Sequence, residues 1–245
     1  MDDQVVRLVE KAWEQFQQVP EDQRFMIAIS GIPGSGKTTL SQIVTEALNA
    51  LHKAQHPEAA GPIAAFVPMD GYHLTRAQLS AMADPATAHA RRGAEFTFDG
   101  AAFLELVRAL RKPLPLPLPP DEERAHTVYA PSFDHAVKDP RADDIAIGPR
   151  HRVVVFEGNY VCLDKEPWRS AALLMDQRWF VEVDFETARR RLVGRHVRAG
   201  IAKDEAEAGK RADENDLVNG EQIVRQRVDV HEVIVSREDV SWKHE

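Results

Sequence analysis

The chain has 245 residues, of which 43% are apolar and 29% charged, so it is long enough and apolar enough to bury a core without disulfides or structural metal. Its net charge of −8 argues against a protein that coats nucleic acid or a membrane surface, because both partners need a basic footprint. Cys162 is the single cysteine, which excludes an internal disulfide and a cysteine zinc site. With no basic, apolar leader and no run of about 20 apolar residues, we expect a soluble protein of the cytoplasm.

The hydrophobic pattern of the first half predicts helices and strands in alternation. Apolar residues three and four apart over 4–18 predict an amphipathic helix that packs on the main body. A short apolar run over 25–29 predicts a buried strand. The expected elements that follow are a glycine-rich turn at 31–36, a helix over 38–51, a polar loop over 54–62, a strand over 63–68, and helices over 75–82 and 101–111.

The segment 112–120, Lys-Pro-Leu-Pro-Leu-Pro-Leu-Pro-Pro, excludes a helix because each proline fixes φ and removes a backbone donor. It predicts polyproline II, either as a stiff connector or, as an alternative, as a ligand for an SH3-like module. We favour the connector and place it inside one domain over residues 1–245. That domain carries an N-terminal helical extension at 1–20, the proline-rich connector at 112–122 and a lid segment at about 189–216.

The second half continues the alternation. The expected elements are strands over 152–156 and 179–183, helices over 168–175 and 186–198, a charged polar segment over 203–216, a helix over 222–228 and a final short strand over 233–235. Strands that alternate with helices predict an α/β fold, doubly wound, with a parallel sheet and helices on both faces.

The strongest motif is Gly31-Ile-Pro-Gly-Ser-Gly-Lys37-Thr38, which matches the phosphate-binding P-loop (Walker A) pattern between a predicted strand and a predicted helix. Its glycines let consecutive N–H groups turn inward, and the helix N-terminus adds positive potential for phosphate oxygens. Lys37 would reach the β- and γ-phosphates of ATP, and Thr38 would bind Mg²⁺. The nucleotide-binding residues predicted here are Gly31, Pro33, Gly34, Ser35, Gly36, Lys37, Thr38 and Thr39.

Two carboxylates follow predicted strands. In a doubly wound sheet, ligands bind at the carboxyl ends of the strands, so Asp70 would face the γ-phosphate and could accept the proton of an acceptor hydroxyl. An aspartate in a turn is the plainer alternative. Glu157 follows four apolar residues, which is the Walker B pattern for Mg²⁺. No Asn-Lys-x-Asp guanine motif is present, which counts against a GTPase.

The helix predicted over 186–198 is strongly basic. Arg191 and Arg195 are four residues apart and share a face, with Arg198 near it. Arginines on a lid can stabilise the charge of a transferring phosphoryl group, and a solvated basic face is the alternative.

These motifs resemble the phosphoribulokinase/uridine kinase family, which includes bacterial-type pantothenate kinase. The nearest branch is that of the pantothenate kinase-like and fructose transport system kinase-like proteins. The resemblance spans residues 24–236 and is carried by the P-loop, Met69–Leu74, Arg91-Arg92-Gly93, Phe98-Asp99, Phe156–Tyr160, Arg195-His196 and Asn215-Asp216-Leu217.

The resemblance implies a small-molecule kinase with a five-stranded parallel core that uses ATP and Mg²⁺. It implies catalytic roles for Asp70, Lys37, Arg191 and Arg195, with Thr38, Glu157 and Asp70 at the metal. The acceptor site it implies comprises Asp70, Tyr72, His73, Arg92, Tyr129, His135 and Tyr160. The lid departs from the arginine-rich run of uridine kinases, so the acceptor stays open between a nucleoside, a pantothenate-like compound and a sugar.

Two other functions stay open at this point. A regulatory or chaperone-like P-loop NTPase would have no acceptor pocket, and a nucleotide-binding relic would have lost its catalytic residues. For partners, we expect a small-molecule substrate, no nucleic acid and no membrane, and we leave a homodimer open.

Overall fold

The computed structural model describes residues 3–117 and 120–237. Its centre is a five-stranded sheet in the order β2-β5-β1-β6-β7, in which every neighbouring pair is parallel. The strands are β1 (Phe25–Gly31), β2 (Ala64–Pro68), β5 (Val153–Glu157), β6 (Gln177–Glu182) and β7 (Glu232–Val235). The predicted α/β class, the five strands and their parallel arrangement are therefore confirmed.

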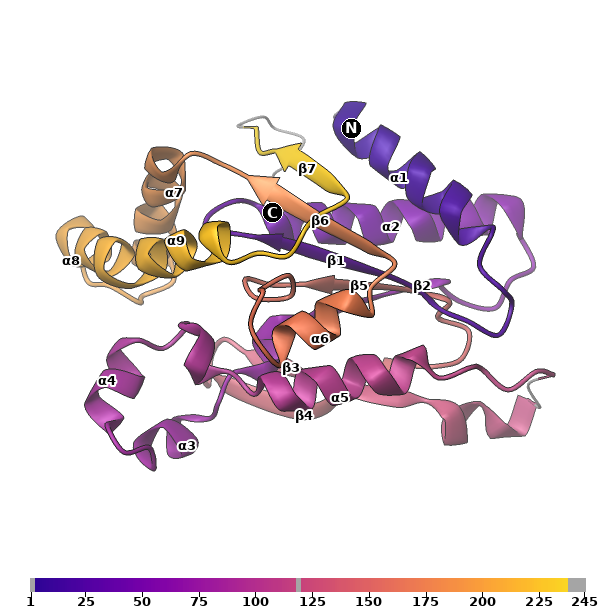
Figure 1. The fold of residues 1–245 in the computed structure, drawn as a ribbon, viewed down its shortest axis with the longest axis horizontal. Coiled ribbons are helices and arrows are strands. Elements are labelled where there is room, and N and C mark those ends of the chain that lie inside the picture. Colours follow the sequence, from indigo (N-terminus) through magenta and orange to yellow (C-terminus); the bar gives the residue numbers. More distant parts are fainter. Residues whose placement is uncertain (1–2, 118–119, 238–245) are drawn as a thin grey trace.

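The alternation of side chains along β1 divides the core into two layers. Phe25, Ile27 and Ile29 pack on one face with the helices α1 (Asp3–Phe16) and α2 (Lys37–Gln55). Met26 and Ala28 point to the other face, where α5 (Gly100–Arg111) and α6 (Trp168–Leu173) cover the sheet. Figure 1 shows α1 and α2 above the sheet and α5 and α6 below it. All seven residues of β1 are buried, as a strand between two helical layers requires.

An antiparallel hairpin, β3 (Val128–Asp134) with β4 (Asp139–Ile147), lies below the sheet and was not predicted. Most of its residues are exposed or half-buried, so the sequence lacks the apolar alternation that marks a strand packed on a core. The hairpin rests on the 3-10 helix η1 (Met69–Tyr72) so closely that a Cβ at Gly71 would lie 2.1 Å from the Pro131 carbonyl oxygen. The hairpin thus covers the turn that follows β2.

Two groups of helices lie at the left-hand end of the molecule in Figure 1, one above the other. The upper group holds the segment 189–216, for which the sequence predicts a lid, and the lower group follows η1. The upper elements are α7 (Phe185–Arg198), α8 (Glu205–Arg211), the π-helix η4 (Ala212–Asp216) and α9 (Leu217–Arg225), and the lower ones are α3 (Arg76–Ser80) and α4 (Pro85–Ala90). The 3-10 helix η2 (Glu95–Thr97) follows α4 in the chain. The helices α4 and α8 were not predicted, and the helix expected over 222–228 begins earlier, at Leu217.

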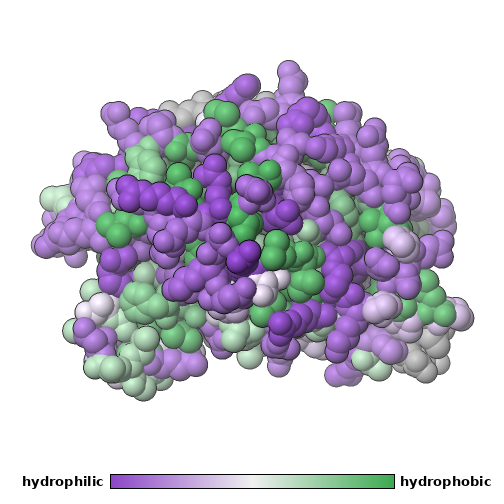
Figure 2. Space-filling model, viewed as in Figure 1, coloured by the Kyte–Doolittle hydropathy of each residue, from purple (hydrophilic) through white to green (hydrophobic). Residues whose placement is uncertain are grey.

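The proline-rich segment forms no helix or strand over 112–117, as predicted, while 118–119 lie outside the described residues. A 3-10 helix, η3 (Pro120–His126), follows it. No helix within residues 3–117 and 120–237 is long and apolar enough to cross a bilayer. Figure 2 shows that the face seen in this view is predominantly hydrophilic.

Candidate active site

The P-loop occupies the turn between β1 and α2, as its motif predicts. Gly34 and Gly36 have φ of +82° and +88°, a conformation that residues with a side chain rarely adopt. A Cβ at Gly34 would also lie 2.7 Å from the Ala188 carbonyl oxygen, so α7 packs directly against the loop. The helix α2 begins at Lys37, which places a long helix N-terminus at the phosphate position.

Three P-loop and strand-end groups meet at the end of β5. The Thr38 hydroxyl Oγ1 donates a hydrogen bond to Glu157 Oε1 at 3.0 Å. The ammonium nitrogen Nζ of Lys37 lies 3.9 Å from the same oxygen. Glu157 ends β5, and β5 pairs with both β1 and β2, so the sheet register brings this carboxylate beside the P-loop.

Burial dominates the electrostatics of this pair. It raises the pKa of the Glu157 carboxyl to about 7, against the opposing attraction of Lys37. Burial also lowers the pKa of the Lys37 ammonium, while Glu157 and Asp70 oppose that shift. A bound cation would favour the carboxylate form of Glu157, because an opposite charge at close range stabilises the ionised group.

Asp70 lies on η1, directly after β2, with its side chain half exposed. Its negative charge opposes the lowering of the Lys37 pKa by burial and adds to the raising of the Glu157 pKa. The ring nitrogen Nδ1 of His73 donates to the Asp70 carbonyl oxygen at 2.9 Å, which fixes the turn that carries this carboxylate. Burial lowers the pKa of His73, against the opposing effect of Asp70.

Aromatic rings surround His73. Its ring centroid lies 4.0 Å from that of Phe98 and 4.9 Å from that of Phe133 on the hairpin. His135 lies in the exposed turn of the hairpin, 5.2 Å from the Phe133 ring. The hairpin therefore brings His135 to the same side as Asp70 and His73, as the implied acceptor site requires.

The basic helix α7 contacts the P-loop through one predicted arginine. Arg191 donates to the Gly34 carbonyl oxygen at 3.1 Å and to the Ser236 hydroxyl at 2.9 Å. Arg195 is exposed, and its positive charge adds to the lowering of the Lys37 pKa by burial and opposes the raising of the Glu157 pKa. The structure thus brings both arginines to the phosphate end of the site.

Four residues of the implied acceptor site lie elsewhere or have other partners. Tyr160 is fully buried and its hydroxyl donates to the Gly93 carbonyl oxygen at 2.9 Å, so it belongs to the core behind the site. Tyr72 is buried edge-to-face on Phe103. The guanidinium of Arg92 is bonded to protein groups. Tyr129 lines a cavity that Tyr72 and His73 also line.

That cavity, of about 450 Å³, lies between the hairpin, α5 and the start of α3, and it includes Tyr72, His73, Leu106, Tyr129 and Asp143. None of its lining residues belongs to the P-loop, and Asp70 and Glu157 are not among them. It lies beside η1, the turn that carries Asp70, and outside the P-loop.

The sequence analysis gave no role to three polar residues that the structure places around this site: Asp139, Asn215 and Asp216. Asn215 and Asp216 lie on η4, where Asp216 accepts from His196 Nε2 at 2.9 Å and its charge acts on Lys37. Asp139 on the hairpin binds Arg92. Asn215 and Asp216 were visible only as part of a resemblance, because nothing local indicates that η4 packs here.

The residues of the P-loop fit a nucleoside triphosphate with a cation. The hydroxyl of Ser35 is buried and has no hydrogen-bond partner in the part of the chain that the structure describes. A helix N-terminus, an ammonium group and a hydroxyl–carboxylate pair converge beside it. These are the donors for phosphate oxygens and the oxygen ligands for Mg²⁺.

Comparison with known proteins gives the same class. The chain is 56% identical over 166 residues to the ATP-dependent kinase-like protein notR' of Aspergillus versicolor, covering 68% of this chain and 92% of that one. It is 41% identical over 197 residues to C227.14 of Schizosaccharomyces pombe, provisionally named a uridine kinase, covering 80% of this chain and 77% of that one. No family model matches the chain.

Solved structures share the fold. A provisionally named fructose transport system kinase from Silicibacter sp. TM1040 has a TM-score of 0.76 and 31% identity, covering 94% of this chain and 98% of that one. YFH7 of Saccharomyces cerevisiae, described as a P-loop kinase, has a TM-score of 0.81 at 23% identity, covering 96% of this chain and 99% of that one, and shows the fold alone. The protein is a P-loop kinase. It belongs to the ATP-dependent kinases of the uridine kinase and phosphoribulokinase type.

Proposed function

We propose that this kinase transfers the γ-phosphate of Mg-ATP to a hydroxyl group of a small polar metabolite, with a nucleoside, a pantothenate-like compound or a sugar as the acceptor classes. The observation that supports it best is the pair of carboxylates at the ends of two adjacent parallel strands, Asp70 after β2 and Glu157 at the end of β5. The negative charges of both carboxylates act on the Lys37 ammonium and oppose the lowering of its pKa by burial. One carboxylate can serve the metal and the other the acceptor.

The chemistry follows from these positions. The acceptor oxygen forms a bond to the γ-phosphorus, the bond from that phosphorus to the bridging oxygen of ADP breaks, and Asp70 takes the hydroxyl proton. Lys37 and Arg195 supply positive charge for the oxygens of the transferring group. Thr38 and Glu157 would hold Mg²⁺, which neutralises phosphate charge when bound.

The test measures ADP release by the purified protein with Mg-ATP and a panel of nucleosides, pantothenate, hexoses, ribulose 5-phosphate and glycerate. Stimulation by one acceptor, with its phosphorylated product found by mass spectrometry, would name the substrate. A flat panel despite tight Mg-ATP binding would instead favour an NTPase whose output is a conformational change.

Asp70→Asn tests the proposed base. We expect ATP affinity to persist and turnover to fall by about 10²–10⁴-fold, which is the usual contribution of a general base. The matched control is Asp229→Asn, because Asp229 is an exposed aspartate outside the site. Turnover that survives in Asp70→Asn would remove Asp70 from the mechanism.

A further inference from the structure

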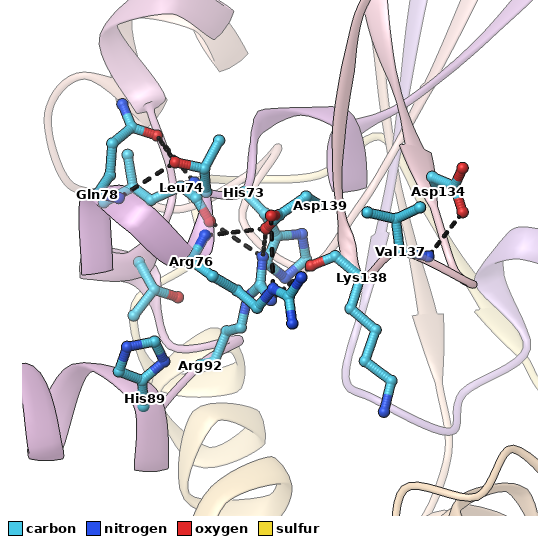
Figure 3. A network of polar contacts seen from close by, with 12 residues as sticks. His73, Leu74, Arg76, Gln78, His89, Arg92, Asp134, Val137, Lys138 and Asp139 are labelled. Carbon is cyan, nitrogen blue, oxygen red and sulfur yellow. Dashed lines mark hydrogen bonds and ion pairs between the residues drawn. The ribbon is translucent and has the colours of Figure 1, made fainter. Parts of the chain in front are cut away.

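Arg92 connects the acceptor side of the site to the hairpin through its guanidinium group. One terminal nitrogen donates to the Lys138 carbonyl oxygen at 2.6 Å. The other donates to the Leu74 carbonyl oxygen at 3.1 Å and to Asp139 Oδ1 at 3.0 Å. Figure 3 shows Arg92 among Leu74, Lys138 and Asp139, which come from the segment after η1 and from the start of β4. One side chain thus joins two segments that are far apart in the sequence.

Asp139 extends this connection to α3. Its Oδ1 accepts from the backbone N–H of Arg76 at 2.9 Å, and its Oδ2 lies 3.5 Å from the Arg76 side chain. Arg76 is the first residue of α3. The hairpin is therefore fixed both to the residue that follows His73 and to the helix that begins two residues later.

The backbone of Arg92 is bound from the other side of the site. Asn215 Nδ2 on η4 donates to the Arg92 carbonyl oxygen at 3.0 Å. Asn215 Oδ1 accepts from Arg91 Nε at 2.9 Å, and Asn219 on α9 accepts from the same guanidinium at 2.8 Å. Both asparagines are almost fully buried, at 4% and 2% exposed. Buried polar groups that are satisfied in this way hold their segments in a single arrangement.

We propose that Arg92 is a positioning residue: it fixes the β3–β4 hairpin against the catalytic turn, and through Asn215 it fixes both to the helices of the lid segment. This inference rests on the proposed function, because it concerns the side of the site where we propose that the acceptor binds. The contacts of Arg92 would hold that side in place without touching the acceptor. The terminal nitrogens of Arg92 are bonded to protein, and its Nε is buried. A planar guanidinium can join three acceptors in fixed directions, which an ammonium group cannot do.

Hydrogen–deuterium exchange on the full-length protein tests the contacts without any substrate. We expect Arg92→Ala and Asn215→Ala each to make peptides from 128–147 exchange about tenfold faster, because each loses charged or buried hydrogen bonds. Peptides from β1 and β5 should exchange as in the unaltered protein. Should Arg92→Ala fail to fold, Asp139→Asn keeps the side-chain shape and tests the same link.

The controls lie on the same two elements. Arg141→Ala removes an exposed arginine from the hairpin, and Glu214→Ala removes an exposed acid from η4. Both should leave the exchange of 128–147 unchanged. Unchanged exchange in Arg92→Ala, or a rise that is equal in the hairpin and in the sheet, would overturn the inference.

Kinetics distinguish positioning from a general loss of structure. With an acceptor identified in the panel, Arg92→Ala should raise the acceptor KM about tenfold or more while the dissociation constant of ATP stays unchanged, and Arg92→Lys should recover part of the loss. Equal loss of ATP and acceptor binding would contradict a role on the acceptor side. Local exchange as expected together with a flat panel would leave the contacts established and reject the proposed kinase acceptor instead.

Discussion

At the scale of single residues, the P-loop glycines combine a backbone requirement with a packing requirement. Gly34 has φ of +82°, and a Cβ there would also meet the Ala188 carbonyl oxygen at 2.7 Å. Gly61 has φ of +104° but no atom within 4 Å of a Cβ, so it isolates the backbone effect. Because α7 approaches the loop this closely, Arg191 on α7 can donate a hydrogen bond to the Gly34 carbonyl oxygen.

We therefore expect Gly61→Ala to lower the free energy of unfolding by about 1–2 kcal/mol, the cost of a left-handed conformation for a residue with a Cβ. Gly34→Ala should lower it further and should also weaken ATP binding, because α7 must move away from the loop. Denaturant unfolding and ATP titration of both variants check this. Equal losses in the two variants would show that the contact with Ala188 is unimportant.

At the scale of secondary-structure elements, the N-terminal helix is attached to the edge of the sheet by charge. Glu232 on β7 lies 2.9 Å from an Arg7 side-chain nitrogen and 2.5 Å from Lys11 Nζ, and Arg7 and Lys11 belong to α1. The Gln4 amide adds hydrogen bonds to both backbone groups of Val235. The hydrogen bond from Arg7 is the chief cause that lowers the pKa of the Glu232 carboxyl.

A lowered pKa in the folded state means that these contacts stabilise the fold above the ordinary pKa of a glutamate, near 4.5, and that the contribution is lost as the pH falls through the lowered value. Glu232→Gln should cost about 0.5–1 kcal/mol of unfolding free energy at pH 7 and nothing in strong acid. Urea unfolding at several pH values measures it. Glu221→Gln, at an exposed pair within α9, is the control and should change little at any pH.

At the scale of the whole molecule, ligand binding and folding are linked through the P-loop. A ligand that binds only the folded state at 100 times its dissociation constant adds about 2.7 kcal/mol to the free energy of unfolding. We expect Mg-ATP to raise the melting temperature of the protein and of Lys53→Met, in which the altered lysine lies at the far end of α2. Lys37→Met should show no such rise. A rise in that variant would mean that the nucleotide binds elsewhere.

The predicted site residues that the structure brings together are those whose environment is local. The P-loop is one continuous turn, and Asp70 and Glu157 each follow an apolar run that had to be a buried strand. Parallel strands present their carboxyl ends at one edge of a sheet, so these three features had to converge once the strands paired. The basic face of 186–198 was equally visible, although only its contact with Gly34 shows which arginine supports the loop.

Tertiary structure alone decided the side on which we propose that the acceptor binds. The β3–β4 hairpin has no apolar alternation of its own, and it packs on η1 and α5. The contacts of Arg92 join residues 46 positions apart on one side and 123 on the other, and no spacing in the sequence predicts such pairs. Tyr160 and Tyr72 belong to the same motifs as Glu157 and Asp70, but the fold buries them, because whether a side chain faces the site or the core depends on the elements packed around it. The amino-acid sequence by itself determined the P-loop half of this kinase, since that half is built from local turns and strand ends. The packing of distant segments determined the half in which we propose that the acceptor binds.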